Sequence, residues 1–441
     1  MKKFFATLSN IWKIEDLRSR ILFTLLCLLI YRIGSFIIIP GVNPASIDDG
    51  QAKEGLLGLL NMFAGGSFSR SSIFALGVMP YISASIVVQL LGIAVPYFQK
   101  LQKEGESGRK KINQVTRYLT IIITALQAMG YVKTQIAPEA RLLAEPLFTI
   151  SSMFVLTAST MFVVWLGEKI TDKGIGNGIS MIIMVGIIAQ LPFGLMSEFT
   201  SRMGAQGGLV SFIVELAALF LVVMFTILIV QGVRKIPVQY AKKIVGAKQY
   251  GGVRQYIPLK VNAAGVMPII FAQAIMFIPT TLSSFFPSLQ SSLASFSDYT
   301  SLTYNLTFAF MIIAFTFFYT AITVNPVQMS DDMKKNGGFV PGVKPGKTTG
   351  DYIDAVISKI TLPGSIFLAM IAIMPSIAII LGVNSQFAHF YGGTSLLILV
   401  GVVLDTLQQI ESHLLMRHYD GLMKTGRIKG RTPIATGGPV I

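Results

Sequence analysis

The chain has 441 residues, of which 52% are hydrophobic and only 13% are charged, and its formal net charge is +15. So apolar a composition excludes a soluble globular protein and a disordered one, and it is typical of a polytopic membrane protein. The single cysteine, Cys27, excludes an internal disulfide framework, and the three dispersed histidines lack metal-ligand spacing. We therefore expect neither a metal ion nor a cofactor.

Ten segments have the roughly 20 mainly apolar residues that a membrane-spanning helix needs. They lie near residues 21–39, 73–95, 118–137, 148–167, 177–196, 210–231, 263–286, 306–325, 360–382 and 394–412. The first segment follows a basic start, as in a signal peptide, but it is too long for one and no small-residue cleavage pattern follows it. It is interpreted as the first span, so the sequence predicts an all-α polytopic membrane protein with ten transmembrane helices.

The positions of the lysines and arginines predict the orientation of the chain. With the N-terminus placed inside, the inside segments hold 30 of the 36 basic residues, the outside loops hold five, and Arg32 lies within the first span. Cytoplasmic loops carry such an excess of positive charge. Both termini are therefore predicted to be cytoplasmic, and the positive surface makes anionic lipids expected partners.

Between the first two spans lies a half-segment, residues 61–72, which is rich in small residues and too short and polar to cross a bilayer. It leads directly into the second span. Irregular backbone at membrane depth is tolerated only where protein or a water-filled cavity surrounds it. We therefore predict that the half-segment lies inside a cavity formed by the other helices.

Residues 174–178 superficially match a glycine-rich phosphate loop, but no strand precedes them and no Lys-Ser/Thr pair follows. A tight turn is favoured, with Asn177 capping the fifth span. The ionisable groups noted inside the spans are Arg32 and Asp405, and a structural role is favoured for both. Because no span offers paired carboxylates or a polar cage, the sequence argues against a pump.

Uncharged polar side chains on the spans have two interpretations. They are Ser83, Ser85, Gln89, Thr120, Thr124, Gln127 and Asn262. Ser and Thr most often join neighbouring helices in membranes. The other interpretation is a seam between helices that can open, because weak polar contacts break more easily than packed aliphatic ones.

Two inside loops, residues 232–262 and 329–359, carry more basic residues than topology requires. The residues singled out are Arg234, Lys235, Lys242, Lys243, Lys248, Arg254 and Lys344. Lys344 lies between two Pro-Gly pairs, which are strong turn signals and predict a rigid tip. Such loops suit the docking of a large acidic protein or of ribosomal RNA.

Several motifs, in order along the chain, resemble the SecY family of protein-conducting channels. They are Met62-Phe63-Ala64-Gly65-Gly66, Lys103-Glu104-Gly105-Glu106-Ser107-Gly108-Arg109, Gly174-Ile175-Gly176-Asn177-Gly178-Ile179-Ser180, Pro258-Leu259-Lys260-Val261-Asn262 with Gly265-Val266-Met267-Pro268, and Gly392-Gly393-Thr394-Ser395-Leu396-Leu397-Ile398. The similarity covers essentially the whole chain. It implies a clamshell of two inverted five-helix halves, residues 1–200 and 201–441, which agrees with the division of ten spans into two odd sets.

The resemblance also implies a function and the roles of particular residues. Unfolded preproteins would cross the membrane through a central pore, and transmembrane segments would leave sideways through a lateral gate. The half-segment would be a loosely packed, mobile plug, comprising Asn61, Met62, Phe63, Ala64, Gly65, Gly66, Ser67, Phe68, Ser69 and Arg70. The pore ring would comprise Ile82, Ile86, Ile179, Ile183, Ile270 and Ile398. The seven polar side chains would lie along the gate, which favours the opening seam.

A channel of this family has no ATP site and is not an enzyme. The implied partners are SecE, SecG, the SecA motor ATPase, the ribosome, signal peptides and nascent chains, and accessory translocation and insertase proteins. The basic loops match the docking site for SecA and the ribosome, although Lys344 stands where the family often has arginine, and lysine lacks the planar fork. The implied location is the cytoplasmic membrane. The alternatives from other classes are a secondary transporter for a small solute and a structural membrane scaffold.

Overall fold

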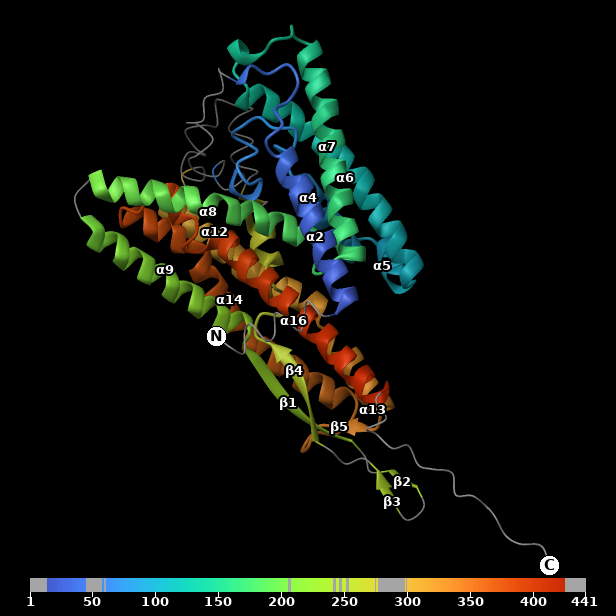
Figure 1. Ribbon diagram of the computed structural model, residues 1–441. Helices are drawn as coiled ribbons and strands as arrows, with labels where there is room; N and C mark the ends of the chain where they lie inside the picture. Colours follow the sequence, from blue (N-terminus) through green and yellow to red (C-terminus); the bar gives the residue numbers. More distant parts are fainter. Residues whose placement is uncertain are drawn as a thin grey trace, which may run out of the picture.

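The computed structural model describes residues 14–44, 58, 61–204, 208–240, 243–245, 248–250, 254–273, 275–276, 298 and 300–424. These residues form mainly long α-helices, which lie in two groups (Figure 1). The all-α polytopic class predicted from the sequence is confirmed.

The first group contains the N-terminal helices. They are α2 (Glu15–Gly34), α4 (Met79–Ala94), α5 (Pro96–Lys103), α6 (Glu106–Gln135), the short 3-10 helix η3 (Pro138–Ala140) and α7 (Leu147–Lys173). α6 packs against both α4 and α7, and α2 packs against α7. α5 is bent away from α4 by 100°. The bend follows from Pro96, because the residue before a proline is pushed out of the helical conformation, and Val95 has extended dihedral angles.

The second group contains the C-terminal helices. They are α8 (Gly178–Gly204), α9 (Gly208–Val230), α12 (Leu302–Thr323), α13 (Pro326–Lys335), α14 (Lys347–Ile380), α15 (Ser385–Ala388) and α16 (Gly393–Lys424). α8 connects the groups, because it packs against α7 of the first and against α9 and α16 of the second. The predicted seventh span is helical over residues 267–273 and 275–276, and its part from residue 277 onward lies outside the described residues.

Seven helices of the described residues are long and apolar enough to cross a membrane, and the bent pair α4–α5 would make eight. The seven are α6, α7, α8, α9, α12, α14 and α16. α2 has 20 residues but carries acidic residues in its first turn and Arg32 in its last. The helix of the second predicted span begins at Met79 rather than near residue 73, because residues 64–78 fold into turns.

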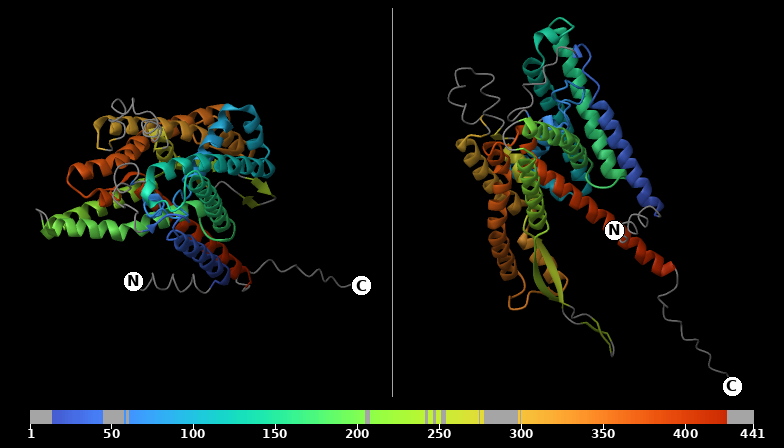
Figure 2. Two further views of the ribbon diagram at one scale, coloured as in Figure 1. Left: turned by 90° about the horizontal axis from the view of Figure 1, so that it is seen from above. Right: turned by 60° about the vertical axis from the view of Figure 1, so that its left-hand side comes forward.

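Strands from both basic loops predicted from the sequence pair in one sheet. β1 (Val233–Tyr240) pairs antiparallel with β4 (Arg254–Lys260), and β5 (Gly338–Phe339) pairs with the other edge of β1. β2 (Lys243–Val245) and β3 (Lys248–Tyr250) form a separate hairpin. The β4-β1-β5 sheet lies toward the end of the molecule where α2 begins and α16 ends, and the β2-β3 hairpin projects beyond it (Figures 1 and 2).

Alternating burial along β1 explains the sheet. From residue 235 to residue 238 exposure alternates: Lys235 and Pro237 are exposed, whereas Ile236 and Val238 are buried, as expected when successive side chains point to opposite faces. The buried face forms a small core with Leu259, Met333, Val340 and Ile353. The two loops are therefore a single body fixed to α13 and α14.

Candidate functional site

Residues 61–78, called here the central segment, lie between α2 and α4 in the chain. One helical turn, residues 61–63, is followed by turns up to residue 78. The side chains of Ser67 and Ser72 are fully buried, and Phe63 is 5% exposed. Protein therefore surrounds the half-segment, as predicted from the sequence, and the irregular backbone continues to Val78.

The central segment belongs to two hydrophobic clusters. To a cluster with α2, α7, α8 and α16 it contributes Met62, Phe63, Phe74 and Val78. To a cluster with α6 and α7 it contributes Ala64, Phe68, Ala75 and Leu76. The expectation of loose packing is wrong for this conformation, because the large apolar side chains between the small residues fill both clusters.

Hydrogen bonds attach the central segment to its neighbours. The Ile39 N–H donates to the Ser71 carbonyl at 2.9 Å, which pairs the segment with the chain that follows α2. The Tyr131 hydroxyl of α6 donates to the Phe68 carbonyl at 2.7 Å. The first bond satisfies the N–H of the buried residue Ile39, and the second attaches α6 to the backbone of the central segment.

One side of the central segment lies directly on the backbone of α8. A Cβ atom added to Gly186 would lie 2.5 Å from the carbonyl oxygen of Phe63 and 3.2 Å from the nitrogen of Gly65. Only glycine fits there without a shift of one backbone. Gly65 and Gly66 also have φ angles of +65° and +84°, a region that L side chains rarely adopt. The position of the segment therefore depends on three glycines.

The structure brings four of the six predicted ring isoleucines into the cluster that holds Phe63. Buried in this cluster or packed against it are Ile82, Ile179, Ile183 and Ile398. Ile86 and Ile270 lie outside it; Ile86 is buried and Ile270 is half-buried. The four come from α4, α8 and α16, so apolar side chains from both helix groups meet the central segment. That all six form a ring stays a prediction.

On α4, the polar side chains predicted for the gate bond within their own helix. Ser83 Oγ donates to the Met79 carbonyl at 3.2 Å, and Gln89 Nε2 donates to Ser85 Oγ at 3.3 Å. These hydrogen bonds do not join α4 to another helix, so they would persist if α4 moved.

The same holds on α6, where Thr120 and Thr124 are fully buried. Each hydroxyl donates to the carbonyl one turn earlier, at 2.7 and 2.6 Å. Gln127 is half-buried on α6, and Asn262, which follows β4, is 8% exposed. The threonine hydrogen bonds therefore stay within α6 rather than linking it to a neighbour.

A cavity of about 190 Å³ lies between the two helix groups near the C-terminal end of α4. Gln89 and Gln102 line it from α4 and α5, whereas Phe318 and Tyr319 line it from α12. Side chains of α4 and α12 therefore line one cavity at this level, and the opening seam stays a prediction.

The described basic residues that are predicted to dock a partner lie on the β4-β1-β5 sheet, on the β2-β3 hairpin and at the turn that holds Lys344. Arg234 and Lys235 are exposed on β1, and Lys344 is exposed at its turn. The Lys344 carbonyl accepts a hydrogen bond from Thr349 Oγ1 at 2.8 Å, which fixes the tip. On β2, β3 and β4 lie Lys243, Lys248 and Arg254. Lys242 lies outside the described residues.

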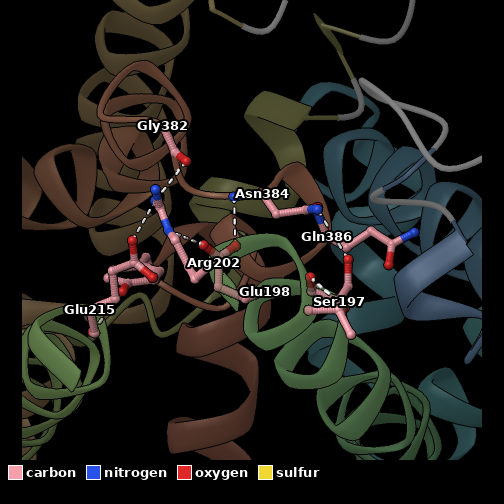
Figure 3. A network of polar contacts seen from close by, with 9 residues as sticks. Ser197, Glu198, Arg202, Glu215, Gly382, Asn384 and Gln386 are labelled. Atoms are coloured by element: carbon pink, nitrogen blue, oxygen red, sulfur yellow. Dashed lines mark hydrogen bonds and ion pairs between the residues drawn. The ribbon is translucent and has the colours of Figure 1, made fainter. Parts of the chain in front are cut away.

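An ionic network that was not predicted from the sequence joins α8, α9 and the segment between α14 and α15 (Figure 3). Arg202 Nε lies 2.8 Å from Glu198 Oε1, and Arg202 Nη2 lies 2.5 Å from Glu215 Oε1. Arg202 Nη2 also donates to the Gly382 carbonyl at 2.7 Å. The Glu198 side chain is only 1% exposed, so this charge depends on its partners.

The Arg202 network continues through Asn384 (Figure 3). The Asn384 N–H donates to Glu198 Oε2 at 2.8 Å, and its side-chain amide donates to Ser197 Oγ at 3.0 Å. The Tyr391 hydroxyl donates to the Glu215 carbonyl at 2.6 Å. The end of α8, the start of α9 and the α14–α16 connection are therefore held as one unit.

The Arg202 network corrects the prediction that no span holds paired carboxylates. Glu215 lies inside the predicted sixth span, and Glu198 follows the fifth directly. The spacing of four residues between Glu198 and Arg202 is a sequence signal that would have revealed this pair. Since both carboxylates bond to a fixed guanidinium, the arrangement stabilises the fold. Asp405, by contrast, is exposed on α16.

The turn between α7 and α8 confirms the predicted helix cap. Asn177 Oδ1 accepts a hydrogen bond from the Ser180 N–H at 3.4 Å. Backbone amides of the turn donate to Thr24 Oγ1 at 3.1 Å and to Gln409 Oε1 at 2.9 Å. The turn therefore connects α2, α8 and α16.

Comparison with known proteins identifies the family. A family model described as SecY matches residues 72–407. The chain belongs to the SecY family. The SecY protein translocase subunit of Streptomyces scabiei is 43% identical over 435 residues, which cover 94% of this chain and 98% of the relative. That of Halalkalibacterium halodurans is 44% identical over 431 residues, which cover 95% and 100%.

Solved channel structures share the SecY fold of this chain. A protein-conducting channel matches with a TM-score of 0.63 at 16% identity, over 94% of this chain and 95% of that one. Sec61 in a canine ribosome-channel complex matches with a TM-score of 0.59 at 15% identity, over the same shares. SecY membership confirms the prediction of a polytopic, non-enzymatic translocase subunit.

Proposed function

We propose that this chain is a channel through which unfolded preproteins cross the cytoplasmic membrane, and from which transmembrane segments pass sideways into the bilayer. SecY relatives along more than nine-tenths of the chain are named protein translocase subunits. The observation that carries the proposal is the central segment, an irregular stretch buried between helices of both groups. A channel that must close needs such an element.

The central segment acts as the plug of the closed channel in this proposal. Phe63 shares a cluster with Ile183 and Ile398, so the segment and the predicted ring close the same passage. A narrow apolar constriction excludes water by dewetting, and β-branched side chains keep it stiff. A plug domain in a solved SecY structure is described as stabilising the closed state and maintaining a membrane seal.

The seam between α4 and α12 is the proposed lateral gate. The cavity beside Gln89 and the hydrogen bonds that stay within α4 and α6 support this, because the helices can separate without breaking those bonds. Signal peptides and transmembrane segments of nascent chains would enter the bilayer there.

The β4-β1-β5 sheet is the proposed docking site for SecA or the ribosome, and SecE and SecG are the proposed membrane partners. Exposed Arg234, Lys235 and Lys344 supply positive charge for long-range steering. Sec61 is described in a ribosome-channel complex. The sheet, the start of α2 and the end of α16 lie at one end of the molecule, in keeping with cytoplasmic termini (Figure 1).

Ion conductance of the reconstituted channel tests the proposal. Deleting residues 61–70, or changing Ile82 and Ile398 to Asn, is expected to raise resting ion leak and to relax the selectivity for signal sequences. Changing the same two residues to Val is the control, because it keeps the constriction apolar and β-branched. Unchanged conductance in the deletion and Asn variants, at equal amounts of reconstituted protein, would refute the plug and the ring.

A further inference from the structure

Two guanidinium groups converge on the backbone of the central segment. Arg32 of α2 donates from Nη1 to the Gly65 carbonyl at 2.9 Å. Arg70 donates from Nη2 to the same carbonyl at 3.0 Å, and from Nε to the Gly66 carbonyl at 2.9 Å. Hydrogen bonds from a charged donor are stronger than neutral ones, and more so where water is excluded.

The Phe36 ring supports both guanidinium groups. The Cζ atom of Arg32 lies 4.8 Å from the ring centroid, and the Cζ atom of Arg70 lies 4.5 Å from it. Both distances are within the range of a cation–π contact. The aromatic ring therefore keeps the two positive groups together over the carbonyls.

The two glycines make room for these contacts. A Cβ atom on Gly65 would lie 3.1 Å from Arg32 Nη1, and one on Gly66 would collide with Arg70 Nη2 and Gln190 Nε2. Both glycines have positive φ angles, which let the backbone change direction sharply at Gly65 and Gly66. The carbonyls are thus presented to the arginines by a turn that only glycine adopts readily.

The two arginines differ in where they are anchored. Arg70 belongs to the central segment, so its bonds to Gly65 and Gly66 are internal and move with the segment. Arg32 belongs to α2, which packs against α7 and α8. The bond between Arg32 and Gly65 therefore crosses from the helix bundle to the segment, and it must break whenever the segment leaves.

We propose that Arg32 is a positioning residue that latches the central segment in its closed place, while Arg70 and Phe36 keep the latched turn in shape. The proposal rests on the proposed plug function and adds the group that controls release. Loss of one charged hydrogen bond at this partly buried site changes the open-to-closed ratio by about ten- to a hundredfold. Arg32 thereby sets how strongly a substrate must act before the segment leaves.

Cysteine labelling of the full-length chain in vesicles, together with its membrane partner subunits, tests the latch. In a Cys27→Ser background, Ser67→Cys places a thiol at a fully buried position of the segment. Adding Arg32→Gln is expected to raise the labelling rate at position 67 about tenfold or more. Arg32→Lys should give an intermediate rate, because it keeps the charge and loses the planar fork.

Two controls separate the latch from general loosening. Arg20→Gln makes the same change near the start of α2, where Arg20 pairs with Asp16 at 3.5 Å, and should leave labelling at position 67 unchanged. Ser152→Cys reports on a buried position of α7 and should label slowly in every variant. Equal labelling at position 67 with and without Arg32→Gln would overturn the proposal, and so would a parallel rise at position 152.

A second variant keeps the latch testable if Arg32→Gln does not accumulate. Phe36→Leu removes the ring beneath both guanidinium groups and should raise labelling at position 67 several-fold, in line with the smaller energy of a cation–π contact. No rise would overturn the proposal.

Conductance of the variant that lacks residues 61–70 separates the plug function from the Arg32 latch. If that deletion leaks but Arg32→Gln labels like the parent, the plug stands and the latch falls.

Discussion

Replacing Gly186 with alanine tests whether close backbone contact with α8 holds the central segment. The added methyl group would lie 2.5 Å from the Phe63 carbonyl oxygen and 3.3 Å from the Phe63 carbonyl carbon. Both are backbone atoms, so no side-chain rotation relieves the clash. Either α8 or the segment must move.

The expected magnitude follows from opposing effects on the two partners. Overpacking a well-packed site costs about 1–3 kcal/mol. α8 itself is favoured by the change, since alanine is a better helix former than glycine by up to about 1 kcal/mol. The cost therefore falls on the seated segment, and a loss of about 1–3 kcal/mol raises the unseated fraction about 5- to 150-fold.

Resting ion conductance in proteoliposomes measures this fraction. Gly130→Ala on α6 is the matched control, because a Cβ atom there meets nothing within 4 Å. We expect Gly186→Ala to leak and Gly130→Ala to remain closed, with both accumulating to the parent level. If the two variants conduct alike, the segment is not held by its contact with Gly186.

Three further outcomes are expected. Arg202→Met should lower the free energy of unfolding by about 3–5 kcal/mol, because Glu198 is left buried without its partner. Adding Glu198→Gln to this variant should restore part of the lost free energy. Thermal unfolding in detergent measures both variants, and parent-like stability of Arg202→Met would contradict the network. Burial lowers the pKa of the His389 imidazole to about 4, so the folded chain stays neutral there while the unfolded chain binds a proton. The free energy of unfolding should therefore fall by about 3 kcal/mol as pH drops from about 6.5 to about 4. His389→Gln should abolish this contribution, and unfolding scans of both proteins at the two pH values measure it. Lys344→Glu should reduce SecA-driven export about tenfold at low salt, as measured with purified vesicles. The controls are Lys347→Glu and assembly of the Lys344→Glu variant with SecE, both of which should be unchanged. Full export by the Lys344→Glu variant would contradict the docking role.

Much of the membrane fold follows from local sequence patterns. Long apolar runs predict α6 to α9, α12, α14 and α16, because a spanning helix satisfies its backbone within one segment. The burial of residues 61–72 follows from the same rule, applied to a stretch too polar to face lipid. Asn177 is predictable as a helix cap because the cap and its N–H partner are three residues apart.

The remaining features depend on contacts between distant parts of the chain. Gln239 pairs with Phe339, so β5 joins a strand that lies 100 positions earlier in the chain. Arg202 reaches the Gly382 carbonyl in the same way. Gly186 is one glycine among 41, and only the course of the central segment shows that it contacts Phe63. Such pairings arise from the packed fold, and composition and periodicity do not report them.

The β4-β1-β5 sheet has a mechanical consequence. β1 begins three residues after α9 ends, and the buried face of the sheet packs on α13 and α14, so the sheet joins these helices. α14 in turn packs along α12, one wall of the seam. If a partner docks on the sheet as proposed, a push on the sheet reaches α14 directly and α12 through α14.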